Sequence, residues 1–265
     1  MQSLVSIPLF KNILIEAAAI VRNIVRDGVT QSYKSDGTLI TKADVAVNAF
    51  LRETLIAVFP DAAWLSEETT DNLRRLKMDW VWVVDPLDGT KEFVQDIPEY
   101  CVSVGLARNG RAIGGGIINP ATGEGGAGFV GSEVEFWGGL DRSEPARELS
   151  IARICVSRSE MLVGDIVPFA DIAAEMYPVG SVAYKLLRVA AGRDDLTFSV
   201  QPKSEWDICG GVALLNASGK HYRRFDGQQL RFNSPDTRIR SGGVAGPSWL
   251  VDQFMQQIAK RCSLT

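Results

Sequence analysis

The sequence predicts a layered α/β fold made of two halves, and three patterns support this prediction. The first half begins with two helical stretches and continues with short apolar strands joined by tight turns. The second half alternates strands with helices, which is typical of a layered α/β arrangement. Between them lies a polar stretch with a proline, Gly138 to Glu148. We therefore divide the chain into residues 1–145 and 146–265.

The first half opens with two predicted helices. Leu9 to Arg26 is apolar but interrupted by charged residues, so it predicts an amphipathic helix that begins near Pro8, and not a membrane span. Lys42 to Phe59 is the second helix, and Thr41 with Asp44 resembles a capping box at its start. The strands expected after it are Ala62 to Ser66, Trp80 to Val84, Cys101 to Ala107 and Ala112 to Ile118 joined at Asn109-Gly110, and Phe129-Val130 and Glu133 to Trp137 joined at Gly131-Ser132.

The second half alternates more regularly. Its expected elements are a strand Arg153 to Ser157, a helix Glu160 to Ala174, a strand Met176 to Val179, a helix Val182 to Ala191, a strand Asp195 to Val200, and a helix that opens at Glu205-Trp206-Asp207 and ends before Gly219. A hairpin through Asp226-Gly227, a strand near Ile239 to Val244 and a helix after Pro247 complete the chain.

The most informative stretch is Asp85-Pro86-Leu87-Asp88-Gly89-Thr90, which follows the apolar run Trp80 to Val84. Pro86 pushes the preceding residue toward an extended conformation, so we expect the strand to end at Asp85. Gly89 permits a tight turn, and Thr90 suits the cap of a short helix, Lys91 to Val94. Carboxylates and a carbonyl are ligands that Mg²⁺ prefers, and a helix start suits phosphate. A surface turn rich in Asp, Pro and Gly is the alternative interpretation.

Other acidic residues lie where an apolar segment meets a turn, as in the sites of open α/β sheets. Glu67 and Glu68 follow the strand that ends at Ser66, and Asp207 lies in the first turn of a helix. Each has a simpler interpretation, because strand ends are often solvated and the helix dipole favours an acid at Asp207. Together with the Asp85–Thr90 turn they form a plausible constellation.

Composition narrows the class of protein. The 265 residues are 46% hydrophobic, enough for a large core, and the formal net charge of −4 argues against a nucleic-acid polymer as partner. The single histidine, His221, does not suffice for a zinc site and is poorly placed for a Ser-His-Asp triad. The scattered cysteines are expected to be free, mostly buried thiols of a cytoplasmic protein: Cys101, Cys155, Cys209 and Cys262.

At these motifs the sequence resembles the inositol monophosphatase superfamily of Mg²⁺-dependent phosphomonoesterases. The resemblance is carried in order by Ser66-Glu67-Glu68, by the stretch from Asp85 to Phe93, and by Trp206-Asp207 with the glycines after it. It extends from about Lys34 to about Gly227. The resemblance implies a five-layer α-β-α-β-α sandwich with the metal site in the cleft between the two halves.

The resemblance also implies roles for individual residues. Glu67, Asp85 and the Leu87 carbonyl would hold one Mg²⁺, and Asp85, Asp88 and Asp207 a second, in a site of two or three ions. The N–H groups of Gly89 and Thr90 would bind phosphate oxygens. The Thr90 hydroxyl, paired with Asp44, would orient or deprotonate a metal-bound water, although Asp44 is also a favourable helix first-turn acid.

Two further features concern the substrate. Lys34 matches a lysine that many relatives carry on a mobile loop near the metals, and it lies in the polar segment Lys34-Ser35-Asp36-Gly37 that could close over the site. Gly180-Ser181 and Lys185 resemble the nucleotidase pattern, in which a helix start and an ammonium bind a second phosphate. A serine cap and a solvated lysine are the alternative there.

The motifs favour the 3′(2′),5′-bisphosphate nucleotidase branch. Lys91-Glu92-Phe93 resembles that branch, whereas inositol-hydrolysing members tend to carry an acid where this chain has Val200. The expected substrate is therefore a small phosphate ester such as 3′-phosphoadenosine 5′-phosphate, cleaved by direct attack of a metal-activated water. An inositol, other polyol or histidinol phosphatase is the first alternative, and a phosphometabolite-binding protein without turnover is the second. A homodimer is a further possibility.

Overall fold

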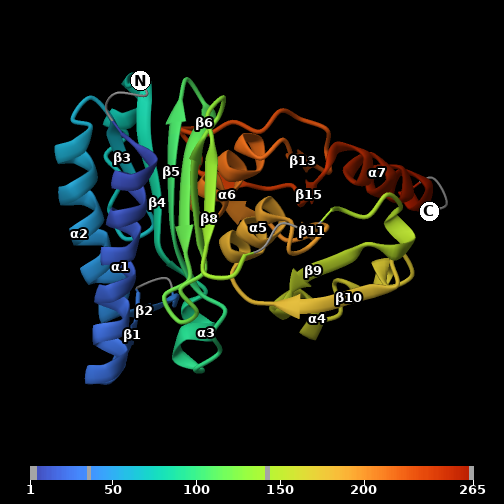
Figure 1. Ribbon diagram of the computed structural model, residues 1–265, viewed down its shortest axis with the longest axis horizontal. Coiled ribbons are helices and arrows are strands. Elements are labelled where there is room, and N and C mark those ends of the chain that lie inside the picture. The colour runs from blue at the N-terminus through green and yellow to red at the C-terminus, as the bar shows by residue number, and fades with distance from the viewer. Residues whose placement is uncertain (1–4, 35–36, 141–143, 263–265) are drawn as a thin grey trace.

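The computed structural model describes residues 5–34, 37–140 and 144–262 of the chain, and side chains as far as residue 260. Five layers succeed one another across the molecule in Figure 1, which confirms the α-β-α-β-α sandwich. The first layer is the helix pair α1 and α2, and a six-stranded sheet, α5 with α6, a five-stranded sheet, and α7 follow.

The helices and the two large sheets make up most of the fold. The helices are α1 (Ile7–Asp27), α2 (Lys42–Val58), α3 (Thr90–Val94), α4 (Arg158–Leu162), α5 (Val182–Ala191), α6 (Glu205–Ala217) and α7 (Ser248–Cys262). The first sheet has the order β3 (Ala63–Ser66), β4 (Trp80–Asp88), β5 (Cys101–Arg108), β6 (Arg111–Ile118), β7 (Gly125–Phe129) and β8 (Val134–Trp137). The second has the order β10 (Glu175–Val179), β9 (Arg153–Ser157), β11 (Leu196–Ser199), β15 (Gly243–Gly246) and β13 (His221–Arg224).

Two small strand pairs and three 3₁₀ turns complete the described part of the chain. The pairs are β1 (Gln31–Tyr33) with β2 (Leu39–Thr41), and β12 (Lys203–Ser204) with β14 (Arg238–Ile239). The turns are η1 (Arg74–Lys77), η2 (Leu149–Ile151) and η3 (Val167–Phe169). In the part of the chain that the structure describes, no helix combines the length and apolarity needed to cross a membrane.

Three apolar cores hold the layers together. Leu14, Leu51 and Trp82 are fully buried between the outer helix pair and the first sheet. Leu187 and Leu214 belong to a second core, around α5 and α6, and a third lies between the second sheet and α7. Because α5 and α6 pack against both sheets, they fix how the two halves face each other across the site. The division at residue 145 stays a prediction.

Glycine allows α6 to lie unusually close to the first sheet. A Cβ on Gly115 of β6 would lie 2.2 Å from the carbonyl oxygen of Gly210 on α6, a distance that no side chain can adopt. This close approach seats the helix whose first turn carries Asp207.

The predicted end of the motif strand was wrong. β4 continues from Asp85 to Asp88, and its pairing with β5 slips by one residue in between, because Asp85 faces Ser103 and Asp88 faces Cys101. This is a β-bulge, a place where a strand tolerates proline and changes direction. The cap assignment was wrong as well. Gly89, at φ +93°, is the N-cap of α3, and Thr90 is the first helical residue.

Three other expectations were wrong in detail. The helix predicted from Glu160 to Ala174 stops at Leu162, because Gly164 adopts a left-handed φ of +88°. No strand directly follows Asp226-Gly227, since β13 pairs with the distant β15, and the predicted strand near 239–244 is divided between β14 and β15. The strands β1 and β2 were not predicted. The hairpin of β7 and β8 was predicted, but β7 extends back from Phe129 to Gly125, which the pattern did not indicate because Gly-Gly-Ala-Gly lacks the usual strand formers.

Other expectations are confirmed. The capping box of Thr41 and Asp44 begins α2, and the hairpin at Asn109-Gly110 joins β5 to β6. Cys101, Cys155 and Cys209 are free and buried, whereas the side chain of Cys262 lies outside the described residues.

Candidate active site

A cleft of about 710 Å³ lies where the end of β4 and the start of α3 face the N-terminal ends of α5 and α6. Its lining contains most of the residues singled out in the sequence, from Glu67 and Asp85 to Lys185 and Asp207. A second groove of about 830 Å³, between the start of α1 and the β7–β8 turn, has a more apolar lining and is built from other residues.

Three carboxylates from three different elements converge in the cleft. Glu67 follows β3, Asp85 lies in β4 and Asp207 lies in the first turn of α6. One oxygen of each lies within 4.8 Å of the corresponding oxygens of the other two. Strand order explains part of this arrangement, because β3 and β4 are parallel neighbours that end at the same edge of the sheet. The structure thus brings together three of the acidic residues singled out in the sequence, whereas their roles as metal ligands stay predictions.

Burial and mutual repulsion destabilise the ionised form of these carboxyl groups. Burial, followed by the charges of Glu67 and Asp88, raises the pKa of Asp85 well above its usual range. Burial and the neighbouring Asp88 raise the pKa of Asp207 to about 8. The pKa of Glu67 is also raised, again mainly by burial. Carboxylates gathered in this way favour a counter-charge among them.

The donor set fits a hard divalent cation. Buried carboxylate oxygens that lie within a few ångströms of one another would lose their mutual repulsion around Mg²⁺, which prefers such ligands. The Leu87 carbonyl lies in the same cleft and accepts a hydrogen bond of 3.0 Å from the Thr90 hydroxyl. Glu67, Asp85 and Asp207, with Leu87 and Asp88 beside them, are the residues that would hold the ions.

Asp207 and Asp44 occupy equivalent places in their helices. Each is the third residue of a helix and closes a capping box, with Ser204 in α6 and with Thr41 in α2. The Oδ2 atom of Asp207 accepts from the Ser204 backbone N–H at 2.7 Å. Oδ2 therefore fixes the side chain of Asp207 at the helix start, and Oδ1 remains available to a metal ion. Asp207 can thus act both as a helix cap and as a metal ligand.

Asp44, buried behind the lining of the cleft, contacts Thr90, as the resemblance implied. The Oδ2 atom of Asp44 accepts from the N–H and the hydroxyl of Thr41, at 2.8 Å and 2.6 Å. Its Oδ1 atom lies 3.3 Å from the Thr90 hydroxyl, which has a second acceptor in the Leu87 carbonyl. Burial raises the pKa of Asp44. The pair is held by long-range contact between α2 and α3, which no local pattern could establish.

Lys34 contacts the acidic residues directly. Its Nζ lies 3.1 Å from Glu67 Oε1 and 2.5 Å from Glu68 Oε1. The segment expected to close over the cleft includes Ser35 and Asp36, which lie outside the described residues. The roles of Lys34 and of that segment stay predictions.

The start of α5 forms the opposite side of the cleft, but its polar groups already have partners. The Gly180 N–H donates to Glu99 Oε2 at 2.6 Å, and the Ser181 hydroxyl donates to Asp88 Oδ2 at 2.7 Å. Lys185 is 2% exposed, and its Nζ donates to the carbonyls of Ser181 and Val179 at 2.8 Å and 3.2 Å. Lys185 is therefore not a solvated lysine, and Gly180 and Ser181 have carboxylate partners where a phosphate had been expected.

Sequence reasoning missed two basic residues of the cleft, Arg158 and Lys203. Arg158 pairs with Glu99 at 2.6 Å, and Lys203 pairs with Glu160 at 3.0 Å. We call Arg158, Lys185 and Lys203 the basic wall, and Glu67, Asp85, Asp88 and Asp207 the acidic wall. The position of Arg158 directly after the strand that ends at Ser157 was the available indication, since sites form at such junctions.

Comparisons with known proteins agree with this geometry. The model of the inositol monophosphatase family matches residues 6–262. Inositol monophosphatase 3 of Solanum lycopersicum is 29% identical over 268 residues, which cover 96% of this chain and 97% of that protein. The 3′(2′),5′-bisphosphate nucleotidase CysQ of Salmonella typhimurium is 27% identical over 216 residues, with 79% and 85% covered. The solved structure of a Thermotoga maritima IMPase shares the fold, with a TM-score of 0.80, 21% identity and 96% of each chain covered.

Proposed function

We propose that this chain, which belongs to the inositol monophosphatase family and is a magnesium-dependent phosphomonoesterase, acts on a nucleoside carrying 3′ and 5′ phosphates, such as 3′-phosphoadenosine 5′-phosphate. The observation that carries the proposal is the basic wall. A substrate with one phosphate needs a counter-charge only at the metals, whereas a second phosphate needs cations elsewhere in the cleft. Arg158, Lys185 and Lys203 lie in the same cleft as the metal-ligand carboxylates.

The position of Val200 supports the same substrate class. Relatives that hydrolyse inositol phosphates tend to carry an acid there, which would bind sugar hydroxyls. Val200 packs instead against the apolar core between the second sheet and α7, and its backbone N–H donates to Glu160 at 2.8 Å. The side chain at this position therefore offers no acceptor for polyol hydroxyls.

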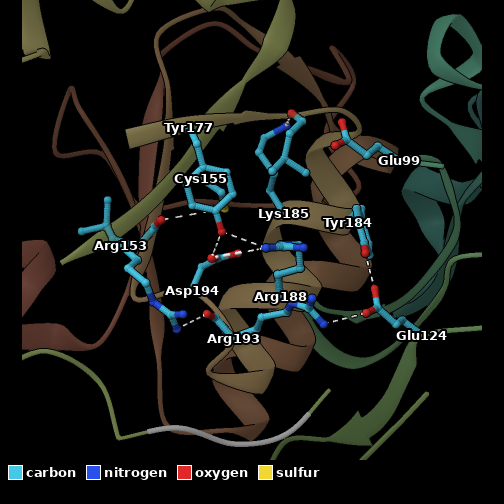
Figure 2. Close-up of polar contacts among 12 residues, drawn as sticks. Glu99, Glu124, Arg153, Cys155, Tyr177, Tyr184, Lys185, Arg188, Arg193 and Asp194 are labelled. Atoms are coloured by element: carbon cyan, nitrogen blue, oxygen red, sulfur yellow. Dashed lines mark hydrogen bonds and ion pairs between the residues drawn. The ribbon is translucent and has the colours of Figure 1, made fainter. Parts of the chain in front are cut away.

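Lys185 is the central residue of the proposed second phosphate site. The side chain of Lys185 is almost fully buried, its ammonium donates to the Val179 and Ser181 carbonyls, and burial lowers its pKa. Figure 2 shows Lys185 beside Tyr184 and Arg188 on α5, with Glu99 on the neighbouring segment. A buried ammonium that is already held by hydrogen bonds loses little side-chain entropy when it binds an anion with its third N–H, because its conformation is already fixed. Arg158 and Lys203 add positive charge on either side, although each shares it with a glutamate.

The chemistry follows from the acidic wall. When bound, Mg²⁺ supplies Lewis-acid stabilisation and lowers the pKa of a bound water. Glu67, Asp85, Asp88, Asp207 and the Leu87 carbonyl would hold the ions in place. The Thr90 hydroxyl keeps lone pairs that can accept a hydrogen bond from the attacking water and so orient it. A proton taken from that water by the Thr90 oxygen would be balanced by transfer of the hydroxyl's own proton to Asp44 Oδ1. The backbone N–H groups of Gly89 and Thr90 would bind the phosphate oxygens.

Steady-state phosphate release tests the substrate. The panel contains 3′-phosphoadenosine 5′-phosphate, 3′-AMP, inositol 1-phosphate and histidinol phosphate, and we expect the bisphosphate to have the highest kcat/KM. If inositol 1-phosphate or histidinol phosphate is preferred, the nucleotidase proposal is wrong and the corresponding phosphatase takes its place.

A lysine variant tests the second phosphate site. Lys185→Met keeps the apolar stem and removes the charge, so kcat/KM for the bisphosphate should fall by roughly ten- to a hundredfold and for 3′-AMP by much less. Lys220→Met is the matched control, because Lys220 is also buried and donates to a carbonyl of α5, that of Ala190, at 2.8 Å. An equal loss for both substrates would contradict a role in binding the second phosphate.

A further inference from the structure

The start of α5 holds one oxygen of Asp88 from two directions. The Ser181 hydroxyl donates to Asp88 Oδ2 at 2.7 Å, and the Ala183 backbone N–H donates to the same atom at 2.6 Å. Ser181 is the N-cap of α5, so the cap and the first turn of one helix grip a carboxylate carried by a strand of the other half. This contact orients the carboxyl group and leaves Oδ1 as the oxygen available to a cation.

The hydroxyl of Ser181 has no hydrogen left for a substrate. It carries a single proton, which goes to Asp88, and it accepts from the Tyr184 N–H at 3.0 Å. The Cys101 Sγ lies 3.3 Å away on a third side. Ser181 is 7% exposed. A phosphate at this hydroxyl would therefore have to displace Asp88, and the two anions would repel each other.

The backbone conformation at Gly180 and Ser181 indicates that Ser181 is held in one position. Ser181 has a φ of +53°, which is unusual for a residue with a side chain. Such a conformation persists where surrounding contacts determine it. The preceding Gly180 has no room for a side chain, since a Cβ there would lie 2.5 Å from Glu92 Cγ.

The rest of α5 is anchored well enough to act as a rigid support. Tyr184 donates to Glu124, which also pairs with Arg193 at 2.8 Å. Arg188 pairs with the buried Asp194 at 2.6 Å. Figure 2 shows these contacts along the helix that carries Lys185. They connect α5 both to the start of β7 in the first half and to the segment that leads into β11.

We propose that Ser181 is a positioning residue, which acts through Asp88 to set the affinity of the metal site, and not a substrate contact. Groups that orient metal ligands typically contribute ten- to a hundredfold to metal affinity. The proposal rests on the metal chemistry of the family and is independent of which phosphate ester is cleaved.

Calorimetric titration of the full chain with Mg²⁺ in the absence of substrate tests this proposal. Ser181→Ala should weaken binding at one class of site by about tenfold or more and leave another class unchanged. Ser181→Gly is the second variant, because it removes the same hydroxyl while relieving the positive φ, so it reports on the hydroxyl even if the alanine variant folds poorly. Ser159→Ala is the control, since Ser159 also lines the cleft but its hydroxyl contacts only Ser157 in the described part of the chain.

The outcomes separate positioning from substrate binding. Unchanged Mg²⁺ affinity in both Ser181 variants, together with a raised KM for the bisphosphate, would overturn the proposal and return Ser181 to the substrate site. Weaker Mg²⁺ affinity that is compensated by higher Mg²⁺ in the kinetic assay, with KM unchanged at saturation, would support it. Because no substrate is present in the titration, this result stands even if the preferred ester is inositol 1-phosphate.

Discussion

The two walls of the active-site cleft differ in how their charges are balanced. On the acidic wall, Glu67, Asp85 and Asp207 approach one another, and in the described part of the chain only Glu67 of the three forms an ion pair, with Lys34. Burial raises the pKa of all three carboxyl groups. On the basic wall, Arg158 and Lys203 each pair with a glutamate. Carboxylates that largely lack ion-pair partners are suited to bind metal cations. Basic residues that are already paired with glutamates will bind only a substrate group, such as a phosphate, that competes with those glutamates.

The walls also differ in their origin in the chain. Five of the residues expected to act at the metals and the phosphate lie within the six-residue stretch from Asp85 to Thr90. The basic wall draws one residue each from the start of α4, from α5 and from β12. Local sequence therefore specifies the catalytic wall closely, while tertiary packing assembles the wall that we associate with the second phosphate. The following predictions separate the two functions.

The largest effect is expected on the acidic wall. Asp85→Asn and Asp207→Asn each remove charge from the metal site, and kcat/KM for any ester should fall by at least roughly 10³-fold. Circular dichroism should show an intact fold, because neither change alters side-chain volume. Asp252→Asn, at an exposed ion pair with Arg223, is the control.

Chelation of Mg²⁺ should reproduce this loss reversibly, for every substrate in the panel. Activity that persists at its original rate in protein verified to be metal-free would contradict the assignment of the acidic wall to metal binding.

A smaller but selective effect is expected for Thr90→Val, which keeps the shape and removes the hydroxyl. We expect kcat to fall by about 10²-fold or more, as for loss of a positioned base, while KM changes much less. Rapid-quench kinetics with 3′-AMP measures this. A raised KM with unchanged kcat would move Thr90 from catalysis to binding, and phosphate retained on the protein after acid quench would indicate a covalent intermediate instead of direct attack by water.

The smallest effect is expected for Glu99→Gln on the basic wall. The glutamine keeps an acceptor for the Gly180 N–H but no longer neutralises Arg158, so KM for the bisphosphate should fall by up to about fivefold. The free energy of unfolding should change by no more than about 1 kcal/mol, because both side chains are partly exposed.

Glu135→Gln breaks a comparable pair with Lys11, far from the cleft, and serves as the control in denaturant titration and kinetics. If Glu99→Gln raises KM for the bisphosphate, then the Arg158–Glu99 pair as a whole, and not the guanidinium alone, binds the substrate.

Most of the site residues could be read from the sequence because they lie at junctions between strands or helices and turns. Glu67 follows β3, Asp207 lies in the first turn of α6, and Asp85 directly follows the apolar run of β4. The pattern of each of these elements is clear, and burial of the element fixes where the acid points. The capping box at Thr41 and Asp44 is a local pattern too, and its interpretation as a helix start is compatible with the contact to Thr90. Local chemistry therefore determined which residues are available and which chemistry they suit.

Tertiary structure decided how those residues are used. The bulge in β4 and the pairing of β13 with β15 depend on contacts between distant segments, which single-sequence patterns do not encode. The start of α5 also depends on such contacts. Gly180-Ser181 with Lys185 is a pattern suited to phosphate, but Gly180 and Ser181 donate to two carboxylates of the other half, Glu99 and Asp88. The sequence determines that the Gly180 N–H and the Ser181 hydroxyl are donors at the start of this helix. Only the tertiary structure determines that Glu99 and Asp88 accept from them, because a hydrogen bond forms between groups that are close in space.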